Sequence, residues 1–216
     1  LRQERLLVAD ESRATADEGT RAHERWVDRR AKLLARGVVP SVLVASVTEQ
    51  AHAAPASAIQ RVTREVVFER VTSRPGGTRF GTLVHAVLAE LPLDADEAGV
   101  RRVTVKQARL LAASSGEIDA AVLACVRALA HPRLRAAAAA AEVRREVPVV
   151  VSGEDGALVE GVIDLAYRDG GGWVVVDFKT DLSVPPVGPY DAQVGAYVDA
   201  IGKATGASVH GSLLFV

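Results

Sequence analysis

The chain has 216 residues, of which 49% are hydrophobic and 25% are charged, a composition typical of a globular protein with one sizeable core or two small ones. It contains no apolar run of about 18 residues and no apolar leader, so we expect neither a membrane-spanning helix nor a signal peptide. The single cysteine, Cys125, excludes a disulfide framework and a cysteine-held zinc or iron–sulfur site, which fits a reducing cytoplasm.

The charge is divided unevenly along the chain, although the net charge is only −1. Residues 1–79 hold 14 Lys/Arg and 10 Asp/Glu, a net of +4, and residues 80–216 hold 12 and 17, a net of −5. Nucleic-acid binders usually carry a basic stripe, because neutralising phosphates drives their affinity. If the second part handles nucleic acid, metal ions must cancel its carboxylates or another element must hold the strand.

Methionine is absent, and the chain begins at Leu1 and ends in the apolar, strand-like HGSLLFV. We therefore expect this sequence to be a piece of a longer polypeptide. Residues 1–36 are charged and helix-prone, with a helix predicted from Asp17 to Leu34 and ended by Gly37 and Pro40. A connector follows, the Ala/Pro/Ser-rich PSVLVASVTEQAHAAPAS. Residues 60–72 fit either a strand or a short helix, and SRPGGTR is a clear break.

The second part has a helical pattern first and a strand pattern later. FGTLVHAVLAEL carries one apolar stripe at helical spacing and stops at Pro92, and residues 96–141 predict further helices. From Glu142 the period changes: EVRREVPVVVSG, LVEGVIDLAY and WVVVDFKT predict three strands, the last two as a hairpin across a Gly-rich turn. A helix in DAQVGAYVDAIGKAT and a strand in ASVHGSLLFV complete an α/β domain with a mixed sheet and helices packed on it.

The hairpin holds two carboxylates and an ammonium in apolar surroundings. Alternation puts Asp177 and Lys179 on one face of their strand, and Val162, Asp164 and Ala166 on one face of the preceding strand. A four-residue turn at 169–172, assumed here, would set Asp164 opposite Asp177, about 4.5–5.5 Å apart at Cβ. Two such carboxylates repel each other unless a divalent cation lies between them, which predicts a Mg²⁺ site for phosphodiester hydrolysis.

A D-x-K motif alone is weak evidence, because an Asp at a strand end often only faces a loop and such matches occur by chance. Further residues strengthen the prediction: Glu146 on the strand before Asp164, Gln193 and Tyr197 at i, i+4 on a later helix, and His85 at the edge of the first apolar stripe. Taken alone, a helical His is more often structural than a ligand, and a Gln–Tyr pair is usually surface and core-edge packing.

The segments GTLVHAVL, REVPVVV, VEGVIDLAY, VVDFKTD and DAQVGAY, in this order over roughly residues 78–216, resemble the nuclease domain of RecB and AddA in the PD-(D/E)XK superfamily. The resemblance implies a restriction-endonuclease-like fold, a mixed central sheet flanked by helices, with a helical insertion. It also implies two regions: residues 1–79 as a helical extension, namely the end of a helicase region and its tether, and residues 80–216 as the nuclease domain.

The resemblance also implies roles for single residues. His85 matches a histidine that helps to bind the metal, and Asp164 matches the acidic metal ligand of the GxIDL motif. Asp177 and Lys179 match the acidic residue and the lysine of DYKT, in which Phe178 replaces the commoner tyrosine.

Three further positions match motifs of the same family. Gln193 and Tyr197 match QxxxY, which supports the site and the DNA strand, and Glu146 matches a recurrent glutamate of the first strand. AddB-type nucleases carry four cysteines for an iron–sulfur cluster, so the single Cys125 places this chain with the type that lacks a cluster.

The resemblance therefore predicts a Mg²⁺- or Mn²⁺-dependent deoxyribonuclease, most simply an exonuclease. It would act on a DNA strand delivered from a duplex end, in the cytoplasm at the bacterial nucleoid. Its expected partners are the helicase part of the same chain and a second helicase–nuclease subunit, in recombinational repair. ATP hydrolysis would lie outside this fragment, which has no GxxxxGK[ST] loop. The alternatives are a catalytically silent copy that guides DNA or docks a subunit, and a stand-alone repair or defence nuclease.

Overall fold

The computed structural model describes residues 13–46, 59–67, 74–152 and 158–216. They belong to two compact units, Leu1–Leu43 and Val44–Val216. The first unit holds helix α1 (Arg13–Val38). This helix is longer than the predicted span from Asp17 to Leu34. It continues through Gly37, which has open space around it, and ends two residues before Pro40. No described helix is long and apolar enough to cross a membrane.

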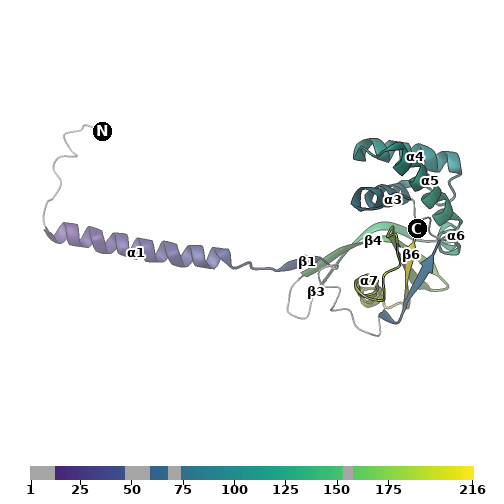
Figure 1. The fold of residues 1–216 in the computed structure, drawn as a ribbon. Helices are drawn as coiled ribbons and strands as arrows, with labels where there is room; N and C mark the ends of the chain where they lie inside the picture. Colours follow the sequence, from purple (N-terminus) through teal and green to yellow (C-terminus); the bar gives the residue numbers. More distant parts are fainter. Residues whose placement is uncertain (1–12, 47–58, 68–73, 153–157) are drawn as a thin grey trace. The chain divides into compact units, whose positions relative to one another are not determined.

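The second unit contains a six-stranded mixed sheet (Figure 1). Its strands are β1 (Val44–Ser46), β2 (Val62–Val66), β3 (Val143–Ser152), β4 (Leu158–Asp169), β5 (Gly172–Lys179) and β6 (Val209–Phe215). They follow the order β1-β4-β5-β6-β2, with β3 paired to β4 outside that path. The β3–β4 and β4–β5 pairs are antiparallel, whereas β1–β4, β5–β6 and β2–β6 are parallel. The predicted mixed α/β architecture is therefore confirmed.

Two strands of this sheet come from the segment that the sequence assigned to the extension before residue 80. The ambiguous residues 60–72 contain strand β2, which runs beside β6, and the predicted connector contains β1, which pairs with β4. Because both strands complete the sheet, the compact unit begins at Val44. The part of the predicted connector after β1, residues 47–57, lies outside the described residues, as do residue 58 and residues 68–73.

The helices of this unit are α3 (Thr78–Glu90), α4 (Glu97–Leu111), α5 (Ser115–Ala130), α6 (Pro132–Ala139) and α7 (Pro189–Thr205). Helix α3 buries the predicted apolar stripe, and Pro92 follows its end. Helix α5 starts at a capping box, in which Ser114 and Glu117 satisfy each other's backbone amides. These local signals explain why the predicted order of elements after residue 80 is observed.

The sheet separates two apolar cores. Helices α3 to α6 cover one face and α7 covers the other (Figure 1). Val176 and Phe178 pack in the core under α3, and Val175 packs in the core under α7. Strand β5 thus alternates as predicted, and it directs Asp177 and Lys179 to the α7 side.

The hairpin register is also as predicted, although its turn is shorter. Gly170 and Gly171 alone make the turn, and both have positive φ angles, 56° and 95°. Two-residue turns of this kind match the twist of paired strands. Asp169 faces Gly172 and Leu165 faces Val176, so the next position in the same register sets Asp164 opposite Asp177.

Strand β4 departs from the predicted alternation at the position of Asp164. Ile163 and Ala166 pack together in the core under α7, whereas Leu165 packs in the core under α3. Regular alternation would have put Ile163 and Leu165 on one face. The expected shared face of Val162, Asp164 and Ala166 is therefore wrong, because the strand changes phase at Asp164.

Candidate active site

The hairpin strands separate where the two opposed aspartates stand. The Asp164 carboxylate accepts a hydrogen bond from the Phe178 backbone amide at 2.7 Å, and its other oxygen lies 3.3 Å from His85 Nδ1. Its side chain is only 12% exposed. Asp164 is therefore oriented from two sides, by the backbone of β5 and by a side chain of α3.

Asp177 is buried more deeply and satisfied less well. Its side chain is 3% exposed, and Oδ2 lies 2.7 Å from Lys179 Nζ. That approach lacks hydrogen-bond geometry, and among the described residues Oδ2 has no hydrogen-bond donor. Burial and the charge of Asp164 raise the pKa of Asp177 from 3.8 to about 6, against the opposing effect of Lys179. The fold thus holds a carboxylate that its own side chains leave incompletely neutralised.

Lys179 is held by groups from β5 and α7. Its ammonium forms the ion pair with Asp177 and donates to Gln193 Oε1 at 3.1 Å, and Gln193 Nε2 donates to the Tyr197 hydroxyl at 3.2 Å. Burial raises the pKa of Tyr197, with Gln193 opposing that shift, so its neutral hydroxyl anchors the chain of contacts. The structure therefore brings the predicted Gln193 and Tyr197 to the predicted lysine.

His85 reaches the site from α3, and its ring packs edge-on against Phe178 with centroids 6.3 Å apart. Burial lowers the pKa of His85, but the contact with Asp164 and the nearby Asp177 outweigh it, so the net direction is upward. In the described structure the contact with Asp164 thus stabilises the cationic form of the His85 imidazole.

Glu146 lies on β3 at the position across from Asp164 on β4. The pairs on either side of it are Arg145 with Leu165 and Val147 with Ile163. Its φ of 48° is unusual for a residue with a side chain and marks a local distortion of the strand. Burial and repulsion by Asp164 raise the pKa of Glu146, and His85 opposes that shift. The structure therefore brings all seven predicted site residues to one end of the β4–β5 hairpin, between α3 and α7.

The donor set fits a hard divalent cation better than a soft one, because it offers carboxylate oxygens and no thiolate. The buried Asp177 Oδ2 without a hydrogen-bond donor is the atom that such an ion would satisfy. Within the described part of the chain, no three His, Cys, Asp or Glu residues are close enough together to hold a metal jointly. The metal roles of His85, Asp164 and Asp177 stay predictions, and the residues offer an ion few protein ligands.

An open pocket of about 490 Å³ leads to this site, within the range of about 300–1,000 Å³ usual for ligand sites. Its walls include the start of α3, the end of β5 and Tyr190 of α7. His85 and Lys179 both face it. A second pocket on the other side of His85 includes Glu146. His85 therefore borders two open pockets, one lined also by Lys179 and the other by Glu146.

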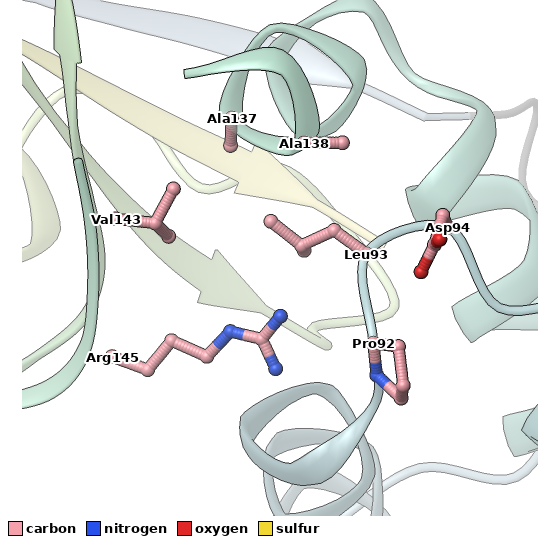
Figure 2. Close-up of a pocket in the computed structure, with 7 residues that line it drawn as sticks. All are labelled: Pro92, Leu93, Asp94, Ala137, Ala138, Val143 and Arg145. Carbon is pink, nitrogen blue, oxygen red and sulfur yellow. The ribbon is translucent and has the colours of Figure 1, made fainter. Parts of the chain in front are cut away.

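Another pocket, drawn in Figure 2, contains none of the predicted site residues. Figure 2 shows Arg145 extending toward the end of α3 near Pro92, where its guanidinium donates to the carbonyls of Ala89 (3.2 Å) and Leu91. Burial lowers the pKa of Arg145. The residue before Glu146 thus ties β3 to the helix that carries His85.

Tyr190 is the site residue that the sequence did not single out. Its ring centroid lies 4.4 Å from Lys179 Nζ, and its hydroxyl donates to Asp181 Oδ1 at 3.2 Å. The sequence carried one signal for it. Tyr190, Gln193 and Tyr197 stand at i, i+3 and i+7 and so share one helix face.

Acidic residues and a lysine gathered at the end of a hairpin in an α/β fold fit metal-assisted hydrolysis of a phosphodiester. Residues 56–215 match the family model of the PD-(D/E)XK nuclease superfamily, and the chain belongs to this superfamily. The match begins upstream of β2, in agreement with the sheet observed. Nucleases of this superfamily generally use divalent metal ions.

Curated relatives point to one kind of protein within the superfamily. The chain is 30% identical over 58% of its length to the A subunit of the ATP-dependent helicase/nuclease of Lysinibacillus sphaericus, of which the match covers 12%. It is 37% identical over 47% of its length to the protein of the same name from Geobacillus thermodenitrificans, of which 9% is covered. The chain thus spans about a tenth of the length of these relatives.

Proposed function

We propose that this chain is the metal-dependent DNA nuclease domain of an ATP-dependent helicase–nuclease. The observation that carries the proposal is the pair of opposed aspartates. Asp164 is fixed by the Phe178 amide, and Asp177 is buried beside Lys179, with an Oδ2 that has no hydrogen-bond donor among the described residues. Lys179 alone does not offset two buried carboxylates, so burying the pair costs stability in the metal-free protein and a bound cation would offset that cost.

In this proposal Asp164 and Asp177 hold Mg²⁺ or Mn²⁺, with His85 and Glu146 beside them. A bound ion of this kind polarises a phosphate and lowers the pKa of a bound water. Lys179 stabilises negative charge on the phosphate or orients the attacking water. Gln193 holds the lysine in place through its contact with the ammonium, and Tyr197 holds Gln193, as their hydrogen bonds support.

The names and lengths of the relatives support a place within a longer helicase–nuclease chain that works with a second subunit. Residues 1–79 then include the end of the helicase region and a tether. The enzyme would degrade DNA as an exonuclease from double-strand ends in recombinational repair, in the cytoplasm at the nucleoid.

The acidic balance of residues 80–216 fits delivery of the strand by the motor, because this part then has no need to bind DNA tightly. We expect the isolated 216-residue chain to bind single-stranded DNA weakly at physiological salt. Tight binding under those conditions would contradict this part of the proposal.

The nuclease proposal is tested by cleavage of a labelled single-stranded DNA with Mg²⁺, with EDTA, and with Asp177→Ala. Cutting that needs Mg²⁺ and is lost in Asp177→Ala supports the proposal. Asp119→Ala is the matched control, because Asp119 is exposed and pairs with Arg101 away from the site. No cutting with Mg²⁺ or Mn²⁺, together with no metal binding in calorimetry, would favour a silent module that guides DNA.

A further inference from the structure

We propose that Tyr190 is a positioning residue for Lys179, acting through the π face of its ring. This inference rests on the proposed nuclease function, in which Lys179 faces the phosphate. It adds a residue to that site for which a distinct chemical role can be tested.

The ring of Tyr190 is one of three groups around the lysine ammonium. Its centroid is 4.4 Å from Lys179 Nζ, while Asp177 Oδ2 and Gln193 Oε1 lie at 2.7 and 3.1 Å. The Lys179 side chain is only 13% exposed. A cation over an aromatic face within about 6 Å is attracted by the ring quadrupole, and more strongly when water is excluded.

The three contacts differ in what they do to the charge. The Asp177 carboxylate offsets the charge of the ammonium, and in the proposed function it is also engaged by a cation. Gln193 takes only one of the three N–H groups. The ring of Tyr190 carries no net charge, so it holds the ammonium in place without forming an ion pair with it, at the edge of the pocket that both residues line.

The ring is itself fixed from its polar end. Its hydroxyl donates to Asp181 Oδ1 at 3.2 Å. Arg74 in turn donates to the backbone carbonyls of Thr180 at 2.8 Å and Asp181 at 3.1 Å, which holds the segment after β5. Tyr190 also lies in the first turn of α7, one turn before Gln193. The ring therefore has a defined place, set by α7 on one side and by the loop after β5 on the other.

Two substitutions separate the ring from the hydroxyl. Tyr190→Phe keeps the π face and loses the bond to Asp181, whereas Tyr190→Leu keeps apolar bulk and loses the π face. Trp173→Leu is the matched control, because that aromatic ring contacts Arg168 instead, at 5.4 Å from its guanidinium carbon. Each variant is compared with wild type for kcat and KM on single-stranded DNA in Mg²⁺, for thermal unfolding, and for the proton chemical shift of the Lys179 ε-methylene, which a ring face moves upfield.

We expect Tyr190→Leu to lower kcat about tenfold with KM and the unfolding temperature unchanged, and Tyr190→Phe to stay within about twofold of wild type. The upfield shift of the ε-methylene is expected in wild type and Tyr190→Phe and lost in Tyr190→Leu. Equal losses of kcat in the two Tyr190 variants, or an ε-methylene without an upfield shift in wild type, would overturn the proposal. A wild-type protein that cuts no DNA and binds no metal in calorimetry would refute the nuclease function, and the chemical shift would still decide whether the ring holds the ammonium.

Discussion

The backbone amide of Phe178 donates its hydrogen bond to the carboxylate of Asp164, at 2.7 Å, at the point where β4 and β5 stop pairing. The Asp164 carboxylate thus accepts a bond that a backbone carbonyl accepts in a regular antiparallel pair of strands. The consequence is an asymmetric pair of aspartates. Asp164 is held by the backbone and by His85, whereas Asp177 is buried with one oxygen lacking a donor among the described residues.

This asymmetry predicts that Asp177→Asn stabilises the metal-free protein at neutral pH. The folded-state pKa of Asp177 is raised to about 6, so the protonated carboxyl contributes stability to the fold below pH 4. That contribution is lost as the pH rises through 6 and the buried carboxyl ionises. An amide stays neutral, so at pH 7.5 we expect a free energy of unfolding higher by about 1–2 kcal/mol, with little change at pH 4. Urea unfolding in EDTA at both pH values measures the difference.

The control for this prediction is Asp119→Asn, whose exposed ion pair with Arg101 should leave the wild-type pH dependence intact. A destabilised Asp177→Asn at pH 7.5 would mean that the contact with Lys179 outweighs the cost of burying the carboxylate.

The lysine and its support should differ in their effects on catalysis. Lys179→Ala removes a charge next to the proposed phosphate position and should lower kcat by about 10²- to 10³-fold. Gln193→Ala removes one contact to that charge and should cost about tenfold. Single-turnover cleavage at saturating Mg²⁺ gives both values. Equal losses would indicate that Gln193 contacts the substrate directly.

Much of this fold follows from local patterns in the sequence. The structure confirms the helix predicted from the apolar stripe of α3 and the hairpin predicted from the Gly-rich turn. The assumed hairpin register holds from Asp169 opposite Gly172 to Leu165 opposite Val176, and extending it by one position would set Asp164 opposite Asp177.

Other features depend on contacts between distant parts of the chain. Strand β2 is only five residues long, and the sequence pattern of this segment fits a helix equally well. Its pairing with β6 makes the segment a strand. The change of phase at Asp164 coincides with the positive φ of Glu146 on the neighbouring strand, which alternation alone does not predict. Tyr190 joins the site through Lys179 and Asp181, two residues outside its own helix.

The close packing of α7 against the sheet at Gly211 predicts that Gly211→Ala lowers the stability of the fold. A Cβ at Gly211 would lie 2.6 Å from Val194 and 3.0 Å from Val198, so the substitution overpacks the core under α7. We expect a loss of about 1–3 kcal/mol in the free energy of unfolding, partly restored by adding Val194→Ala. The control, Gly116→Ala, has open space in α5 and should stabilise by about 0.5–1 kcal/mol. A neutral Gly211→Ala in urea unfolding would contradict this packing.

The first turn of α7 is held by an ion pair to β2. Arg64 Nε lies 3.2 Å from Asp191 Oδ1, and the two side chains are 21% and 3% exposed. Asp191 also accepts the backbone amide of Gly188 at 2.8 Å. Asp191→Ala should therefore cost about 3–5 kcal/mol, because it leaves Arg64 without its carboxylate. A double-mutant cycle with Arg64→Met measures the pair, and additive losses would show that the two residues act independently.

The proposed nuclease function requires that Asp164 and Asp177 together bind a divalent cation. Titration of Mn²⁺ into EDTA-treated protein, followed by the electron paramagnetic resonance of the free ion, tests it most directly. We predict saturable binding to wild type and to Asp119→Asn, weakened at least about tenfold by either Asp164→Asn or Asp177→Asn, since even residues that only orient ligands contribute 10–100-fold. Equal Mn²⁺ uptake by wild type and both site variants, or no saturable uptake by wild type, would contradict the account.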